Sequence, residues 1–387
     1  MKAIQKECLA RALEARAARD ISEGNICGAS VYVSQHGETC FRGHFGTTVP
    51  GGNEPISERT LYRMASMTKP ITTVAALIAC EQGLLSLDDP VSRYLPDYKD
   101  MTVICPEADG TYTEECCAVP LTVWHLLTHT SGLRNSRAEI AFRDVCTASL
   151  SLREFVSVLA TKPLAFAPGT AAEYNPIAAF DVLTVILEDV TGMDYLEYLQ
   201  EEVLAPCGMR DTTFVPSKEQ WLRLVSMHNR ADGRSIVCEK PAGCVFENIP
   251  ATRYLGGAGL ISSLSDYIGF AETLRRGGVT ADGERILSEE SVRMMAGPQA
   301  PFQIQTARQD PFTYSERWGL GVRTVAGAGY ERLPEGAYGW SGAYGTHFFV
   351  DPMNDVVGIY LKNSAYDGGS GAVTSANFET DVHDALF

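Results

Sequence analysis

The stretch Met64-Ala65-Ser66-Met67-Thr68-Lys69-Pro70-Ile71 decides the fold, because it places a serine and a lysine in an S-x-x-K spacing at the predicted start of a helix. Side chains with this spacing lie about one helical turn apart, so Ser66 and Lys69 are expected to point the same way. A serine hydroxyl becomes an effective nucleophile when a neighbouring base takes its proton. A lysine can be that base where burial or nearby cations lower its pKa. S-x-x-K also arises by chance, as a helix-capping serine beside a surface lysine. Other parts of the sequence are therefore needed to distinguish a catalytic pair from a chance motif.

Three blocks of sequence favour the catalytic interpretation. The stretch Leu61 to Pro70 resembles the active-site segment of class C β-lactamases and family VIII carboxylesterases. The stretches Glu81 to Val91 and His125 to Leu133 are similar to the same family. Matching blocks are spread over roughly residues 25–365. The resemblance implies a sheet flanked by helices, a helical domain, and an active site in the cleft between them.

Hydrophobic periodicity predicts strand-bearing ends around a middle that is mostly helical. The early part has the patterns of a helix followed by two strands, and a further helix is predicted from near Ser66 to about Gln82. From there to about residue 200 the patterns are helical, with few strand patterns. The remaining expected elements are a helix at 3–19, strands at 29–34, 39–45 and 318–325, a helix N-capped by Ser265, a hairpin over 346–362 and a closing helix at 374–387.

This order predicts an α/β fold, in which an antiparallel sheet flanked by helices carries an inserted all-α domain. With the resemblance, the fold class is β-lactamase/transpeptidase-like. We assign residues 1–85 and 186–387 to the α/β domain and residues 86–185 to the inserted helical domain.

A tyrosine in the middle of the chain is the next candidate. The family carries Y-x-N or Y-S after a Pro-Gly turn, and here Pro168-Gly169 precedes Tyr174-Asn175. A phenol beside a lysine can share its proton, so Tyr174 could relay protons with Lys69. Asn175 directly follows the tyrosine, which departs from the family pattern. It is a candidate for substrate binding, with a helix N-cap as the alternative.

The third element is Trp340-Ser341-Gly342, which matches the W-x-G of family VIII carboxylesterases. Neither K-T-G nor S-D-N, which accompany S-x-x-K in class A enzymes, occurs in the chain. We expect these residues to bind substrate, with Gly342 allowing it to approach the strand. The resemblance places the oxyanion hole at the backbone N–H groups of Ser66 and Ala343. The alternative is an ordinary core tryptophan in a strand.

Other polar patterns point to structure rather than chemistry. His125 and His129 have the spacing of a zinc pair, but the glutamate of H-E-x-x-H is missing, so structural hydrogen bonds are expected. Gly256-Gly257-Ala258-Gly259 lacks the context of a phosphate loop and resembles a cleft-lining loop of the family. We therefore predict neither a metal nor a cofactor.

Composition indicates which kinds of binding partner and which cellular compartment to expect. The net charge of −16 disfavours nucleic acid and anionic membranes. The 11 cysteines are scattered, which fits a reducing compartment. No signal-like apolar segment follows Met1. We expect a cytoplasmic protein without nucleic-acid or membrane partners, and the oligomeric state is left open.

These observations favour a serine hydrolase, specifically a carboxylesterase that forms an acyl-enzyme on Ser66 from small acyl esters. Trp340 stands where the lysine of K-T-G would pair with the carboxylate of a β-lactam or a peptide. A β-lactamase or D-alanyl peptidase with a β-lactam-like substrate is one alternative. An acyltransferase and a non-catalytic binding protein of the same fold are the others.

Overall fold

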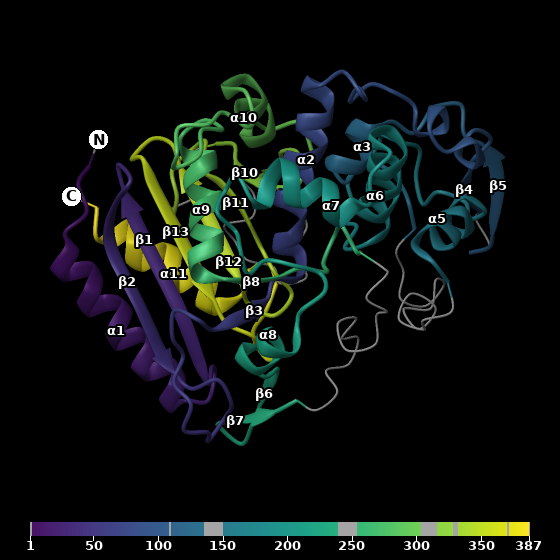
Figure 1. Cartoon of the computed structure of the whole chain (residues 1–387). Helices are drawn as coiled ribbons and strands as arrows, with labels where there is room; N and C mark the ends of the chain where they lie inside the picture. Colours follow the sequence, from purple (N-terminus) through teal and green to yellow (C-terminus); the bar gives the residue numbers. More distant parts are fainter. Residues whose placement is uncertain are drawn as a thin grey trace.

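A seven-stranded antiparallel sheet, in the order β2-β1-β13-β12-β11-β10-β9, forms the centre of the molecule (Figure 1). The computed structural model describes residues 2–107, 110–134, 150–238, 254–302, 316–327, 332–369 and 371–386. Strands from both ends of the chain meet where β1 pairs with β13. The strands of this sheet are β1 (Gly28–Gln35), β2 (Glu38–Gly46), β9 (Glu316–Trp318), β10 (Arg323–Val325), β11 (Tyr338–Ser341), β12 (His347–Asp351) and β13 (Val356–Leu361).

Helices cover both faces of this sheet. On one face, α1 (Lys6–Ser22) and α11 (Val373–Asp384) pack in one apolar cluster with β1, β12 and β13 (Figure 1). On the other face, α9 (Leu264–Arg275) packs Phe270 and Tyr267 against Phe348 of β12. Side chains of a strand alternate between the two faces, so each covered strand buries both sets. Removing one such phenylalanine from water contributes roughly 1.5–3 kcal/mol.

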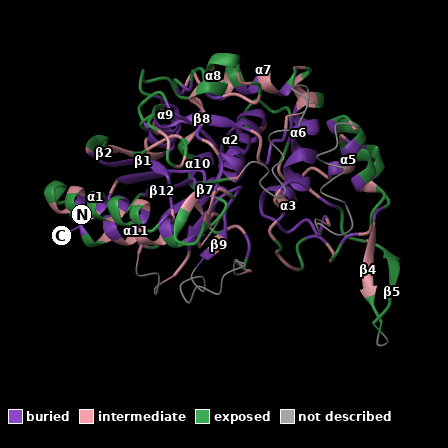
Figure 2. Ribbon diagram, turned by 90° about the horizontal axis from the view of Figure 1, so that it is seen from below, coloured by how far each residue is buried: buried purple, intermediate pink, exposed green. Residues whose placement is uncertain are grey.

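The helical part packs beside this sheet around α2 (Thr68–Glu81) and α6 (Ala178–Thr191). The side chains of α2 are buried from Thr68 to Ala79, as Figure 2 shows by its purple colour. A helix buried all round needs apolar residues on every side, and the run from Val74 to Ala79 supplies them. Lys69 is the one charged side chain of the buried stretch from Thr68 to Ala79. Other helices here are α3 (Val123–Leu127), α5 (Leu152–Ala160), α7 (Tyr195–Leu199) and η4 (Gln200–Leu204).

Shorter elements complete the described chain. Strand pairs lie outside the main sheet, and the pair β4–β5 projects from the helical part (Figure 2). The shorter elements are β3 (Leu61–Arg63), β8 (Ile261–Ser263), β4 (Thr102–Pro106), β5 (Tyr112–Cys116), β6 (His228–Ala231), β7 (Arg234–Val237), η1 (Ala65–Met67), η2 (Val91–Arg93), η3 (Pro96–Tyr98), α8 (Lys218–Arg223) and α10 (Glu289–Ala296). Among the helices of the described ranges, none has both the length and the apolarity that crossing a membrane requires.

The architecture confirms the predicted fold class but corrects its details. The insertion at 86–185 is not all-α, because the β4–β5 hairpin lies within it. The β-branched residues of Thr102-Val103-Ile104 were a strand signal. The boundary expected at residues 185–186 falls inside α6, so that division would cut a helix.

Three local predictions also differ from the structure. The helix expected to begin near Ser66 begins at Thr68, after a 3₁₀ turn that contains Ser66. The cap of α9 is Ser263, which accepts from the Asp266 N–H, and not Ser265. The strand expected over 318–325 is two strands, β9 and β10, because the left-handed Gly321 (φ 65°) lets the chain turn between them.

Candidate active site

Ser66 lies in the tight turn η1, between strand β3 and helix α2. Ala65 before it has a φ of 48°, a left-handed conformation that costs a non-glycine residue free energy. The turn is held by a hydrogen bond from the Met67 N–H to the Met64 carbonyl, 3.2 Å long. The strained turn places Ser66 at the start of α2 with its side chain 7% exposed. Such strain is typical of functional sites, where surrounding structure holds it.

The ammonium of Lys69 is buried beside Ser66. Its Nζ donates to the carbonyls of Pro176 at 2.6 Å and Gly257 at 2.7 Å, and lies 3.3 Å from Ser66 Oγ. Burial lowers the pKa of Lys69 to about 7, and the charge of Asp181 partly opposes that shift. A side chain at Gly257 would put a Cβ 3.2 Å from Nζ, so the glycine lets its carbonyl approach the lysine.

Tyr174 completes a cluster of three side chains at the nucleophile. Its hydroxyl donates to Ser66 Oγ at 2.6 Å. Burial raises the pKa of Tyr174 to about 12, although interactions with Ser66 and Trp340 act to lower it. The indole N–H of Trp340 lies near the phenol without forming a full hydrogen bond to it or to any other group of the described chain. The phenol is therefore protonated at neutral pH.

Aromatic rings form the wall behind Tyr174. Its ring stacks on Trp318 with centroids 5.7 Å apart and planes 11° apart. Trp340 packs on both, at 5.2 Å from Tyr174 and 4.9 Å from Trp318. His129 also lies against Trp318, at 4.2 Å. Sequence patterns did not single out Trp318, because its place at the end of a predicted strand gave no sign that it would stack on the tyrosine.

The W-x-G segment on β11 divides its residues between the two faces of the sheet. The Trp340 side chain faces the catalytic cluster, whereas Ser341 Oγ lies 2.8 Å from His347 Nδ1 on the opposite face. The expectation that the Ser341 side chain binds substrate is therefore wrong, since neighbouring residues of a strand point to opposite faces. Gly342 has an internal reason to be glycine, because a Cβ there would lie 2.3 Å from the Met64 carbonyl oxygen.

The expected oxyanion-hole residues lie at two adjoining turns. Ala343 follows β11 in an exposed turn, and Ser66 is in η1. Within the described ranges, neither backbone N–H donates to a protein acceptor. Backbone N–H groups that lack a protein acceptor are of the kind that can bind a developing oxyanion, and the assignment of the oxyanion hole to these two groups stays a prediction.

Asn175 and the two histidines serve the local structure. The amide of Asn175 donates to the Leu133 carbonyl at 2.9 Å and accepts from the Ala179 N–H at 3.2 Å. This buried side chain holds the start of α6 instead of facing substrate, which corrects its candidate binding role. His129 Nδ1 accepts from the Asn175 N–H at 3.1 Å, and His125 closes a capping box with Thr122. Among the described residues, no group of side chains has the arrangement of a metal site.

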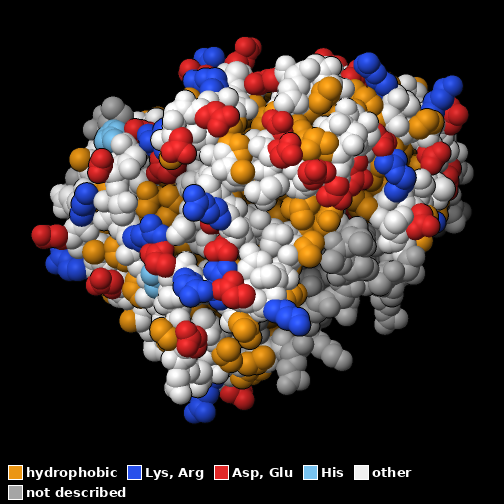
Figure 3. All heavy atoms as spheres, viewed as in Figure 1, with side chains coloured by type: hydrophobic (Ala, Val, Ile, Leu, Met, Phe, Trp, Pro, Cys, Tyr) orange, Lys and Arg blue, Asp and Glu red, His pale blue; other side chains and the backbone are white. Residues whose placement is uncertain are grey.

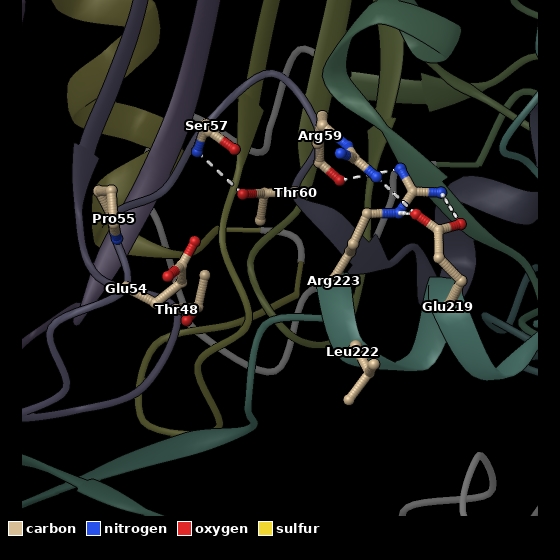
Figure 4. Close-up of a pocket in the computed structure, with 9 residues that line it drawn as sticks. All are labelled: Thr48, Glu54, Pro55, Ser57, Arg59, Thr60, Glu219, Leu222 and Arg223. Carbon is tan, nitrogen blue, oxygen red and sulfur yellow. Dashed lines mark hydrogen bonds and ion pairs between the residues drawn. The ribbon is translucent and has the colours of Figure 1, made fainter.

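A separate hollow of about 330 Å³ lies near α8 (Figure 4). Its polar groups pair with one another: Arg59 with Glu219 at 2.6 Å, and the Arg223 guanidinium with the Arg59 carbonyl at 3.1 Å. It contains neither Ser66 nor Lys69. On the face shown in Figure 3, acidic side chains intermingle with basic ones and no continuous basic area forms.

The fold and this cluster define a serine hydrolase of the beta-lactamase family. The beta-lactamase family profile matches residues 9–377, and the chain belongs to that family. The chain is 31% identical over 397 residues to Esterase EstB of Burkholderia gladioli, covering 95% of this chain and 94% of that one. It is 28% identical over 399 residues to lovastatin esterase of Penicillium rubens, covering 94% and 96%. The solved structure of "EstCE1, a hydrolase with promiscuous acyltransferase activity" superposes with a TM-score of 0.78 at 26% identity, over 98% of both chains. The predicted family is confirmed.

Proposed function

We propose that this protein is a carboxylesterase that cleaves small acyl esters through an acyl-enzyme on Ser66. The observation that supports it is the convergence of Lys69 Nζ and Tyr174 Oη on Ser66 Oγ, at 3.3 and 2.6 Å. A serine with a base and a proton donor in contact has the groups needed for nucleophilic catalysis.

Lys69 is suited to act as the base. A neutral amine has two N–H donors and one lone pair, and the carbonyls of Pro176 and Gly257 accept two donors at 2.6 and 2.7 Å. The lone pair of the neutral amine is then left facing Ser66 Oγ. With a pKa of about 7, a large share of the lysine is neutral at physiological pH. Lys69 can thus take the hydroxyl proton as Ser66 Oγ bonds to the ester carbonyl carbon.

Tyr174 is suited to move the proton onward. Its pKa of about 12 keeps the phenol protonated, and its hydroxyl is directed at Ser66 Oγ. As the tetrahedral intermediate collapses, the C–O bond to the alcohol breaks and the phenol donates a proton to the departing oxygen. Lys69 restores the phenol proton. Water then attacks the acyl-enzyme with proton transfers in the reverse direction, releasing the carboxylic acid and Ser66.

The N–H groups of Ser66 and Ala343 are our candidates for the oxyanion hole. Both belong to short turns, and both are unpaired in the described chain. Preorganised donors of this kind stabilise the negative oxygen of the tetrahedral intermediate, and removing one typically costs about 10²–10³-fold in kcat.

The aromatic wall favours neutral esters over β-lactams. Trp340 presents an indole, beside the rings of Tyr174 and Trp318, where a K-T-G enzyme presents a lysine. A β-lactam carboxylate would have to lose water there, which is costly for a charge without a partner. The esterase names of the relatives from Burkholderia gladioli and Penicillium rubens agree with this proposal.

A comparison of substrates tests the proposal. We expect kcat/KM for p-nitrophenyl acetate or butyrate to exceed that for nitrocefin on the same preparation, with Ser66→Ala as the background control. Trp340→Lys should shift the ratio toward nitrocefin. Nitrocefin turnover equal to or above ester turnover in the wild-type protein would instead identify a β-lactamase.

Acyl transfer is a second candidate, because an acyl-enzyme can react with an alcohol in place of water. The promiscuous acyltransferase activity ascribed to EstCE1, whose structure this chain resembles, motivates this candidate. Adding an alcohol such as 1-butanol to the p-nitrophenyl butyrate assay separates the two. Butyl butyrate as the main product would assign transfer, and butyrate as the main product would assign hydrolysis.

A further inference from the structure

We propose that Thr346 is a positioning residue that sets the spacing of the two oxyanion donors. Its hydroxyl ties the turn that presents the Ala343 N–H to the turn that presents the Ser66 N–H. This inference rests on the proposed function, which it deepens by naming the side chain that holds the hole together.

The link begins at the carbonyl of Met64. Thr346 Oγ1 donates to this oxygen at 2.9 Å, in a fully buried position. The same oxygen accepts the Met67 N–H at 3.2 Å, which is the hydrogen bond that closes the nucleophile turn. Ser66 lies inside that turn, so its N–H is held relative to the Met64 carbonyl. Thr346 therefore bonds to the atom that also fixes the serine.

The other end of the link is the turn after β11. The Thr346 carbonyl accepts the Gly342 N–H at 2.7 Å, and the Gly342 carbonyl accepts the Gly345 N–H at 2.9 Å. These bonds close the loop that presents Ala343. One residue thus holds the Ala343 turn through its main chain and the Ser66 turn through its side chain.

The turn that contains Ser66 and the turn that contains Ala343 are tightly packed against each other. A Cβ at Gly342 would lie 2.1 Å from Thr346 Oγ1 and 2.3 Å from the Met64 carbonyl oxygen. The glycine, the hydroxyl and the carbonyl therefore meet at one point. This contact gives the W-x-G glycine a role in bringing the turns together, in addition to the substrate approach that the sequence predicts.

A second, indirect brace lies behind the same turns. The Asn363 amide pairs with the main chain of Arg63, accepting from its N–H at 2.9 Å and donating to its carbonyl at 3.1 Å. Next to it, the Ser364 N–H donates to the Tyr344 carbonyl at 2.8 Å. Because this brace remains when the Thr346 hydroxyl is removed, the turns should shift slightly without coming apart.

The expected consequence is a loss in the chemical step. Misplacing a reacting group by about 1 Å can cost about 10²-fold, so we expect Thr346→Val to lower kcat by about 10- to 100-fold. KM should stay within about threefold of wild type, because the oxyanion forms only after substrate binds. Thr346→Ser keeps the hydroxyl and should retain most of kcat.

The experiment measures two readouts on the full chain: kcat and KM for p-nitrophenyl butyrate, and the rate at which a fluorophosphonate labels Ser66. Labelling joins Ser66 Oγ to phosphorus and expels fluoride, and it places a phosphoryl oxygen in the hole. Thr273→Val is the matched control, because the buried Thr273 also donates its Oγ1 hydroxyl to a backbone carbonyl, that of Gly269 at 2.8 Å in α9. Thr346→Ala, which adds no atoms, replaces Thr346→Val if that variant does not fold.

Slower turnover and slower labelling in Thr346→Val, with rescue in Thr346→Ser and near-normal kcat in Thr273→Val, would support the inference. The inference would be overturned if Thr346→Val had wild-type values of both turnover and labelling. It would also be overturned if Thr346→Ser or Thr273→Val lost as much as Thr346→Val. The labelling rate keeps the two proposals separate. A wild-type protein that labels at Ser66 but hydrolyses no ester contradicts the esterase proposal, and the labelling rates of the variants still decide the role of Thr346.

Discussion

The pH dependence of ester hydrolysis tests whether Lys69 is the base. A base works in its deprotonated form, so activity should rise with pH through the pKa of Lys69, which is about 7. A group with this pKa is neutral in about 9% of molecules at pH 6 and about 91% at pH 8. We therefore expect kcat/KM to increase about tenfold between these two pH values.

We expect this inflection to come from Lys69 and not from His129 or His125. Burial and the nearby Lys69 hold the pKa of His129 well below its usual 6.5, and burial also lowers the pKa of His125. Both shifts move the titration of these imidazoles to lower pH, away from that of the lysine. Tyr174, with a pKa of about 12, stays protonated throughout.

The assay is kcat/KM for p-nitrophenyl butyrate from pH 5.5 to 9, corrected for spontaneous hydrolysis. Lys69→Arg should remove nearly all activity, as Lys69→Ala should, because a guanidinium does not deprotonate in proteins. His125→Asn should keep the inflection near pH 7. A flat profile between pH 6 and 8, or a Lys69→Arg variant within a few-fold of wild type, would show that Lys69 acts only as a charge.

Three further predictions address the nucleophile, the phenol and the fold. Ser66→Ala should abolish both turnover and fluorophosphonate labelling, and residual activity in protein free of contaminating esterase would exclude Ser66 as nucleophile. Tyr174→Phe keeps the aromatic ring stacked on Trp318 but removes the hydroxyl that donates to Ser66. We therefore expect kcat to fall by about 10²–10⁴-fold. A fall of less than threefold would exclude a proton-transfer role for Tyr174. Asp367→Asn should lower the unfolding free energy at pH 7 by about 3 kcal/mol, because it removes the carboxylate that pairs with buried Lys362. The pKa of Asp367 is held far below its usual value by Lys362 and by hydrogen bonds from Thr374, against the effect of burial. The difference between variant and wild type in urea unfolding should therefore shrink as the pH falls below about 4. A constant difference would mean that the ion pair is not its cause.

Alternating hydrophobicity and turn residues correctly predicted the elements that depend mainly on neighbouring residues in the sequence. Strands β1, β2, β12 and β13 appeared where alternation and turn residues predicted them, and α2 ended at Glu81, close to the predicted cap. The prediction of one strand over 318–325 was wrong because Gly319 and Gly321 permit a turn there. The apolar residues around these glycines have the pattern of a continuous strand, so the turn was not predicted. The β4–β5 hairpin was missed because its few β-branched residues lie in a stretch where helical and loop patterns dominate.

The sequence by itself determined the family, the fold class, and Ser66, Lys69 and Tyr174 as a candidate set, because spacing and motif are properties of the chain. It could not say which way a side chain faces. Only the tertiary structure turned Ser341 toward His347, engaged Asn175 in backbone hydrogen bonds and stacked Trp318 on Tyr174. It also buried Lys69, which lowers the pKa of that lysine to about 7, and it brought two carbonyls distant in the chain to the lysine Nζ. The physical reason is that burial, orientation and the Thr346–Met64 contact arise only when distant segments pack together, and no local pattern encodes them.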